Sequence, residues 1–399
     1  MLTSGLTELH SQSKLALMIK PLFLPISLLS IAVAGNAATL QVGPDKPFPT
    51  PCAAIAVAQD GDVIEIDAGL YLRDVCVVRP NNLTLRGVNG RAHLEARDAN
   101  AQGKGIWVIK GNDVLVENIE FSGASVPDHN GAGIRAEGIN LTVRNCYFHD
   151  NQEGILESNV AGSNILIEFS EFDHNGFSDG RSHNIYIGHA ASLTFRFNWS
   201  HRAKVGHLLK SRAAENYIYF NRLSDDDTGN ASYEINLPNG GASYVIGNII
   251  QQSKNTDNST ILSYLEEGTN SLNPDHNLYV YNNTFVNDRL RGGTFVRVAS
   301  PGSAEIINNI FTGPGDVCPQ NCTVFPTNFI GDPLFVDAAD FDYHLLAGSP
   351  AINAGAELGE FTPIFEYLHP ACGEDRNTQG QVDIGAYEFG GAGPPLVCR

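Results

Sequence analysis

The strongest constraint on the fold is a short strand-forming pattern that recurs from Val116 to Phe311. Each copy is an apolar or β-branched run with an Asn in it or beside it, and the spacing falls within the 20–50 residues typical of solenoid repeats. The copies are VENIEF, VRNCYF, IEFSEF, FRFNWS, YFNRLS, VIGNII, VYNNTF and IINNIF. Such runs, separated by Gly-rich turns, favour strands. Because one coil cannot bury its apolar face alone, the coils must stack, and the pattern predicts an all-β parallel β-solenoid with one chain winding through it.

The recurring Asn residues are expected to be structural. Asn tolerates a left-handed backbone, and its amide can hydrogen-bond to identical neighbours along a stack. We therefore assign no function to Asn145, Asn221, Asn248 or Asn308.

Both ends of a solenoid must be covered. The Ala-rich stretch Ala53–Gln59 predicts a helix that caps the N-terminal end. The segments GDPLFVD, DYHLLAGSPAINAG and VDIGAYEF predict irregular closing coils at the other end. No linker divides the chain, so residues 39–390 are expected to form one domain, followed by a flexible tail over 391–399.

These residues resemble a known family. GNDVLVENIEFSG, NLTVRNCYFHDN, YVYNNTFVN and SPAINAG followed by DIGAYEF look like exported right-handed parallel β-helix proteins of the pectate-lyase-like superfamily. The resemblance covers about residues 39 to 390 and implies the right-handed form of the fold. It does not identify an activity, because that fold carries lyases, hydrolases, epimerases, esterases and adhesive proteins.

The N-terminal segment resembles an export signal. A lysine, Lys20, precedes the apolar run PLFLPISLLSIAVA and the small residues around Ala37 and Ala38. We expect residues 1–38 to be a signal peptide, with Met18 as a possible start, because the run is short and interrupted by prolines. Such a signal leads to a secreted or periplasmic protein without distinguishing the two.

The seven cysteines are consistent with an oxidising compartment, since none forms a CxxC pair. Proximity suggests the pairs Cys52 with Cys76, Cys318 with Cys322 and Cys372 with Cys398. Cys146 lies within the apolar pattern LTVRNCYF and is expected to be a buried, inert thiol.

Charge restricts the partners. With a formal net charge of -19, the average surface repels phosphate, which argues against nucleic acid or, after signal cleavage, a membrane as a partner. We expect a monomer.

The window Gly180–Arg212 is an exception to the acidic composition, because it holds six Lys or Arg and four His but no Asp or Glu. Such a window on a solenoid groove suits an extended anionic polymer such as an acidic polysaccharide.

Three residues within and beyond this window are spaced by one coil. Tyr186, Lys210 and Glu234 lie 24 residues apart, so we expect them to form an outward column. Arg212 would lie beside Lys210 on the same face, and Arg135 would extend that face two coils earlier.

This arrangement suits β-elimination from a uronic acid. The proton beside a carboxylate is hard to remove, so cations must first neutralise the carboxylate. Lys210 is the candidate base, with its pKa lowered by Arg212, Lys204 and His207. The proton donor to the leaving oxygen is Tyr186, His207 or Tyr233. The predicted catalytic set is Lys210, His207, Tyr186 and Glu234, and the predicted substrate-binding set is Arg135, Arg181, His183, Arg202, Arg212 and Tyr233.

The segment KSRAAENYIYFNR resembles the lysine-containing coil of chondroitinase B and alginate lyases on this fold, in which the lysine is the base. That resemblance implies the same role for Lys210. Those enzymes carry calcium-binding acidic residues just before the lysine, where this chain has AKVGHLL. One coil on they carry an Arg within LRxG, where this chain has SYEINLPNGG. We therefore expect no metal ligands and no cofactor, with calcium left open, and Arg202, Lys204 and Arg212 in place of a calcium ion.

Other interpretations remain open. Lys210 and Glu234 could form a cross-strand ion pair without catalytic meaning. A glycoside hydrolase would need two carboxylates, such as Asp226 and Glu234, at one bond. The acidic turn Asp225–Asp227 could bind calcium or be a solvated turn, and Glu266 and Glu267 could line the groove or belong to a turn. The chain could also be a glycan-binding envelope protein without activity.

Overall fold

Strands pair in parallel from coil to coil in a computed structural model of the chain, which describes residues 37–398. Nine strands form sheet B: β3 (Cys76–Val78), β5 (Gly105–Ile109), β8 (Ala132–Ala136), β11 (Glu153–Glu157), β14 (Ile185–Ile187), β17 (His207–Ser211), β20 (Tyr233–Leu237), β23 (Thr260–Tyr264) and β26 (Thr294–Val298). The prediction of an all-β parallel β-solenoid is confirmed. The expected signal segment 1–38 lies outside the described residues except for its last two.

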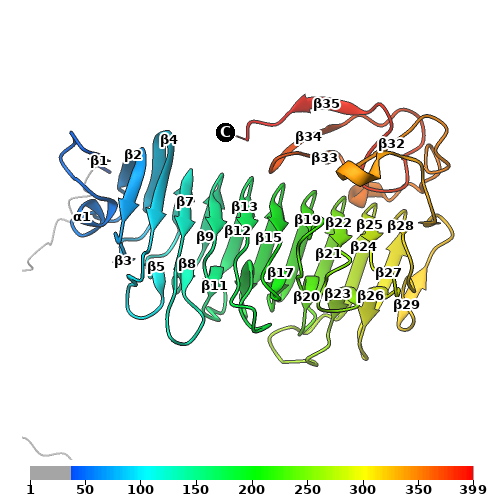
Figure 1. The fold of residues 1–399 in the computed structure, drawn as a ribbon, viewed down its shortest axis with the longest axis horizontal. Helices are drawn as coiled ribbons and strands as arrows, with labels where there is room; N and C mark the ends of the chain where they lie inside the picture. Colours follow the sequence, from blue (N-terminus) through cyan, green and yellow to red (C-terminus); the bar gives the residue numbers. More distant parts are fainter. Residues whose placement is uncertain (1–36, 399) are drawn as a thin grey trace, which may run out of the picture. The chain divides into compact units, whose positions relative to one another are not determined.

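The second sheet, sheet A, contains 21 strands in two columns that follow sheet B in every coil. The first column holds β1 (Thr39–Val42), β2 (Val63–Leu72), β4 (Thr84–Glu95), β6 (Val114–Glu117), β9 (Leu141–Arg144), β12 (Asn164–Glu168), β15 (Ser192–Arg196), β18 (Glu215–Tyr219), β21 (Ala242–Ile246), β24 (Asn277–Tyr281), β27 (Ser303–Ile307) and β29 (Cys322–Val324). The second column continues from the ends of β2 and β4 through β7 (Ile119–Ser122), β10 (Tyr147–His149), β13 (Glu171–Asp173), β16 (Trp199–His201), β19 (Arg222–Ser224), β22 (Ile249–Gln252), β25 (Thr284–Asn287), β28 (Ile310–Thr312) and β30 (Phe329–Ile330). Figure 1 shows the coils stacked along one axis.

Stacked side chains fill the interior. The buried rings of Phe121, Phe148 and Phe172 come from successive coils, with centroids 4.9 Å apart at each step. The parallel register places these three residues side by side on neighbouring strands, so each ring packs on its equivalent. The repeated apolar positions thus form one continuous core.

Asparagine occupies two adjacent corner positions with different roles. Asn145 and Asn308 adopt a left-handed backbone, with φ of 50° and 58°. Asn221 and Asn248 lie one position further on, where side chains form a buried ladder. The Oδ1 of Asn248 accepts hydrogen bonds from the backbone nitrogen and Nδ2 of Asn221, both at 2.9 Å. Both the left-handed turn and the buried ladder are structural roles, as predicted for these four residues.

The N-terminal helix is shorter than predicted. Helix α1 (Pro51–Ile55) has five residues, with Thr50 as its N-cap, and Ala54 and Ile55 are buried. It ends before Val57, so the helix expected over Ala53–Gln59 is not confirmed.

The C-terminal segment folds back along sheet A instead of continuing the coils (Figure 1). It contains β31 (Phe335–Asp337) paired with β32 (Asp342–Leu345), and an antiparallel sheet of β33 (Phe365–Leu368), β34 (Cys372–Arg376) and β35 (Ala392–Pro395). Two short 3₁₀ helices, η1 (Ala338–Asp340) and η2 (Gly359–Phe361), lie between these strands. The segment packs on second-column side chains; for example, the ring centroids of Trp199 and His369 are 4.5 Å apart. The segment expected as a free tail therefore contains a paired strand.

Three disulfides join the cysteine pairs that proximity suggested, and Cys146 is free and buried. Burial raises the pKa of the Cys146 thiol to about 12, which keeps it protonated and unreactive at neutral pH.

Candidate active site

A column of outward side chains crosses sheet B. Strand register places Tyr186 beside Lys210, Lys210 beside Asn236, and Asn236 beside Ser263. Arg135 begins the same column, separated from Tyr186 by Leu156. Sheet B lies on the side of the solenoid opposite the C-terminal segment (Figure 1), so that segment leaves this column uncovered.

Four side chains form a compact charged cluster at the end of β17. The Nε of Arg212 donates to the Tyr186 hydroxyl at 2.8 Å, and its Nη2 donates to Oε2 of Glu267 at 2.6 Å. The Nζ of Lys210 lies 5.0 Å from the centroid of the Tyr186 ring and 3.6 Å from Oε1 of Glu267. Asn239 accepts a further hydrogen bond from Arg212. We call Tyr186, Lys210, Arg212 and Glu267 the sheet B cluster.

Burial and neighbouring charges shift the pKa values of Lys210 and Glu267. The Lys210 side chain is 13% exposed, and burial lowers its pKa; the carboxylate of Glu267 acts against this shift and the charge of Arg212 adds to it. Partial burial acts to raise the pKa of Glu267, but the hydrogen bond from Arg212 and the charge of Lys210 lower it overall. Lowering the pKa of a lysine increases the fraction that is neutral and able to accept a proton.

An aromatic row adjoins the cluster. His183 and His207 stack with centroids 4.3 Å apart, and Tyr233 meets His207 edge-on at 4.9 Å. Burial lowers the pKa of both histidines well below the usual value. The backbone nitrogen of His207 donates to Nδ1 of His183, so that ring nitrogen carries no proton. Both imidazoles are therefore neutral at pH 7, and His207 does not supply the positive charge that was expected to act on Lys210.

Glu234 was wrongly placed in the column. Coil lengths vary, so the residue beside Lys210 is Asn236, and Glu234 turns into the interior with 0% exposure. Neither of its oxygens has a hydrogen-bond partner within the described residues. The predicted ion pair with Lys210 is therefore absent. Burial and the nearby Asp225 raise the pKa of Glu234 well above the usual value, and burial raises the pKa of Asp225 to about 8.

Glu234→Gln should make the fold more resistant to mild alkali. Because burial raises the folded-state pKa of Glu234, the unfolded chain binds fewer protons above about pH 4.5, and stability falls as the pH rises. The amide cannot ionise, so the variant should have a higher thermal midpoint than the wild type near pH 8 and a similar one near pH 4. The exposed Glu305→Gln is the control. A midpoint at pH 8 that drops below that of the wild type would contradict the assignment.

Three basic residues that were expected at the site lie elsewhere. Arg202 follows β16 and pairs with both oxygens of Asp173, at 3.0 Å and 2.9 Å, on the sheet A side. Lys204 pairs with Asp150 at 3.1 Å. Both have acidic partners, so they do not join the sheet B cluster. Arg181 lies exposed in the loop before β14, where its backbone nitrogen donates to Asp179.

The carboxylate pair required for a hydrolase is also not assembled. Asp226 accepts hydrogen bonds from Arg222 at 3.3 Å and from Ser224 at 2.9 Å on the sheet A side. Glu234 is fully buried and cannot flank a glycosidic bond.

The sequence reasoning missed Glu153, Asn236 and Asn239. Glu153 accepts a hydrogen bond from the backbone nitrogen of His183 at 2.9 Å, and burial raises its pKa well above the usual value, although the charges of Lys210 and Arg135 act against this. Asn236 could have been found by allowing coil lengths to vary by a few residues around the spacing of the repeats.

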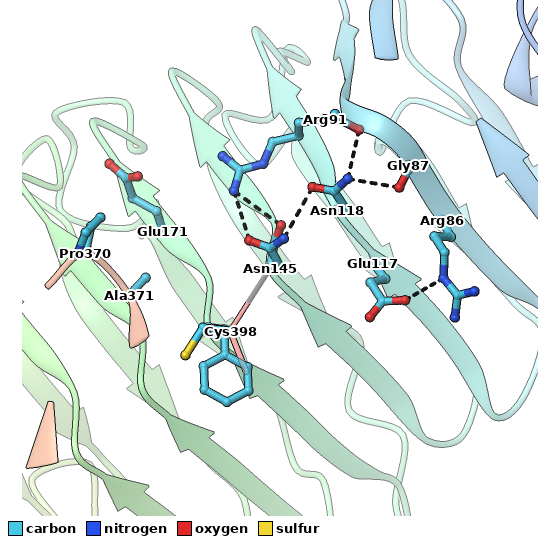
Figure 2. Close-up of a pocket in the computed structure, with 12 residues that line it drawn as sticks. Arg86, Gly87, Arg91, Glu117, Asn118, Asn145, Glu171, Pro370, Ala371 and Cys398 are labelled. Atoms are coloured by element: carbon cyan, nitrogen blue, oxygen red, sulfur yellow. Dashed lines mark hydrogen bonds and ion pairs between the residues drawn. The ribbon is translucent and has the colours of Figure 1, made fainter. Parts of the chain in front are cut away.

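A second region with functional groups lies on sheet A. A cavity of about 790 Å³ separates the first coils from the C-terminal segment. Figure 2 shows Arg91 reaching toward Asn145, with Glu171 and the backbone near Pro370 on another side of the cavity. Arg91 donates to Oδ1 of Asn145 at 3.2 Å.

Comparison with known proteins supports the fold. A family model described as a right handed beta helix region matches residues 68–223. The solved pectate lyase Pel9A aligns with a TM-score of 0.67 at 15% identity, covering 88% of this chain and 96% of that chain. ORF18 of Geobacillus virus E2 aligns at 0.42 with 16% identity (70% and 57% covered), and a pectin methylesterase from Aspergillus niger at 0.34 with 12% identity (82% and 96% covered). None of the curated proteins searched matches the chain.

No helix among the described residues is long and apolar enough to cross a membrane. At these sequence identities, similarity to a solved structure establishes the fold alone. The alignment with Pel9A is consistent with the parallel strand pairing of sheets A and B. The chain folds as a parallel β-solenoid, and its residues 68–223 match the model of a right handed beta helix region.

Proposed function

We propose that this protein is an exported polysaccharide-active enzyme that binds an acidic, uronic-acid polysaccharide along sheet B and cleaves it by β-elimination. One observation carries the proposal: Lys210, whose pKa is lowered mainly by burial, and Arg212 both lie over the ring of Tyr186, on the side of the solenoid away from the C-terminal segment. A base, a cation and a hydroxyl donor are the three groups that elimination beside a carboxylate requires.

Each group has a defined part in the proposed reaction. The carboxylate of the sugar binds Arg212, which neutralises the charge that develops on it. Neutral Lys210 Nζ takes the proton from the carbon beside the carboxylate, and the bonding electrons form the new double bond. The glycosidic C–O bond breaks, and its oxygen takes a proton from the Tyr186 hydroxyl. Arg212 Nε donates to that hydroxyl oxygen, which leaves the phenol proton available and places a positive charge beside the oxygen that loses it.

Three further features support the proposal. Arg135 lies on the same column, where it could bind another carboxylate of a chain running across the strands. The fold is shared with a solved pectate lyase, which makes polyuronides the first substrate class to test. Three disulfides fit an exported protein, either secreted or periplasmic.

The test is ultraviolet absorbance of the unsaturated uronide product on alginate, pectate, glucuronan and glycosaminoglycans, with and without a chelator. A rising signal on one polymer would support elimination and identify the substrate. Binding of a polymer without any absorbance change would overturn the lyase proposal in favour of a glycan-binding protein. Reducing ends that appear without the unsaturated product would instead indicate a hydrolase.

Glu267→Gln should bind the acidic polymer more tightly. The Glu267 carboxylate already occupies Arg212 and Lys210, as a substrate carboxylate would, so substrate must displace it. Removing this competitor should lower the dissociation constant by roughly threefold to tenfold, or about 1 kcal/mol, because the pair is partly exposed. Glu305→Gln makes the same change in net charge on sheet A and serves as the control. An equal gain in both variants would mean that net charge, and not the site, sets the affinity.

A further inference from the structure

Two histidines and a glutamate from three successive coils converge on the second column of sheet A. His93 on β4 pairs in register with Glu120 on β7, and His149 follows on β10. Oε1 of Glu120 lies 3.3 Å from Nδ1 of His93 and 3.1 Å from Nε2 of His149. All three ligand atoms lie within 4.8 Å of one another, and no other such group of three occurs among the described residues.

These separations suit a single bound ion. Ligand atoms at about 2.0–2.1 Å from a tetrahedral zinc ion lie about 3.3 Å apart, close to both distances to Glu120. The side chains are 26%, 24% and 21% exposed, so an ion could enter from solvent and keep open coordination positions.

The outer nitrogen of each ring has its own partner. Nε2 of His93 lies 2.7 Å from the Ser122 hydroxyl, and Nδ1 of His149 lies 3.0 Å from Oδ2 of Asp150. In protein metal sites such outer contacts orient each imidazole and fix the nitrogen that faces the metal. A simple ion pair between Glu120 and one histidine would need neither the second ring nor both outer contacts.

We infer that His93, Glu120 and His149 form a binding site for a divalent transition-metal ion of the zinc type. Two imidazole nitrogens and one carboxylate oxygen favour zinc and similar ions over calcium or magnesium, which prefer oxygen ligands. This site is separate from the sheet B cluster and does not depend on the function proposed for it.

The site lies beside the cavity under the C-terminal segment. Glu120 pairs in register with Tyr147, and Tyr147 pairs with Glu171, which lines the cavity (Figure 2). The Tyr147 ring stacks on His149 at 4.5 Å, and the guanidinium of Arg91, another lining residue, lies 6.0 Å from the Tyr147 ring. A metal ion here would stand near a guanidinium, a combination that favours a small anionic ligand in the cavity.

Isothermal titration of the full, tag-free chain with zinc chloride, after removal of bound metal by a chelator, tests the inference. We expect one equivalent to bind with a dissociation constant of about 1 μM or lower. Cobalt(II) should give visible absorption bands of a site with nitrogen ligands. Absence of binding to the wild type at tens of micromolar would overturn the inference, whatever the variants show.

Variants assign the ligands. Glu120→Gln and His149→Gln should weaken zinc binding by at least about 100-fold, and Ser122→Ala, which removes only an outer contact, by about 10-fold. His344→Gln changes an exposed histidine that pairs with Asp342 and should leave the affinity unchanged. Thermal midpoints of the metal-free variants show whether each one folds. Folded Glu120→Gln and His149→Gln proteins that bind zinc like the wild type would overturn the inference.

Discussion

Lys210→Met is expected to reduce kcat for elimination by about 10²- to 10⁴-fold while polymer binding is largely kept. Proton abstraction by a positioned base contributes that range, and methionine keeps much of the length of lysine without a basic nitrogen. The Nζ of Lys210 lies over the Tyr186 ring, and the other proton acceptor of the cluster, the Glu267 carboxylate, is a weaker base because its pKa is lowered. Initial rates of absorbance increase, measured at saturating polymer, give the effect on kcat.

The control is Lys204→Met, which removes a lysine from the same basic window. Its amine pairs with Asp150 on the sheet A side, so it should leave kcat within about twofold of the wild type. Equal losses in the two variants would show that the positive charge of the window, and not a base at position 210, controls the rate. A Lys210→Met protein with full activity would remove Lys210 from the mechanism.

Asn248→Ala is expected to destabilise the solenoid by about 3–5 kcal/mol. The Oδ1 of Asn248 is the acceptor for both nitrogens of Asn221, and its Nδ2 donates to Asn283 and to the buried carbonyl of Ile218. Alanine leaves several of these buried groups without partners, at a cost of about 1–3 kcal/mol for each group. Urea unfolding followed by circular dichroism measures the loss.

Asn277→Ala is the matched control, because Asn277 is exposed and its amide bonds only to Asp275 and Ser303. Its cost should stay within about 0.5 kcal/mol. If Asn248→Ala and Asn277→Ala cost the same, the ladder would not contribute to stability beyond an ordinary asparagine.

The sequence was sufficient for the architecture because the fold repeats. Each strand-forming run predicts the same packing, so a wrong assignment in one coil does not change the predicted architecture. Lys210 beside Tyr186 was also predictable, since those two coils differ by the assumed 24 residues. The next coil is two residues longer at this point, and a fixed spacing therefore selected Glu234 where Asn236 lies.

Contacts between distant segments were beyond sequence reasoning. The C-terminal segment returns along sheet A because its side chains pack there, as His369 does against Trp199. No local sequence pattern predicts such a contact. The partners of Arg202 and Lys204 lie one and two coils away on another face, and both residues looked free in the linear sequence. The group of His93, Glu120 and His149 draws one residue from each of three coils, so its members are too far apart in the chain to form a recognisable motif.

The asparagine ladder and the folded-back C-terminal segment both affect how strongly the solenoid would resist a pulling force along its axis. Hydrogen bonds between coils run along the axis, so a pulling force loads the coil boundaries in series. From Asn198 to Asn328 each boundary is reinforced by side-chain amides, and the returning segment ties later coils together, as where Asn282 donates to the carbonyl of Asp383. The earlier coils carry Cys146 and Ser170 at the corresponding corner, and their buried amide ladder, formed by Asn151, Asn175 and Asn184, lies at another corner and is shorter. We therefore expect the coils around Lys210, whose boundaries lie within the longer ladder, to separate only under a large pulling force.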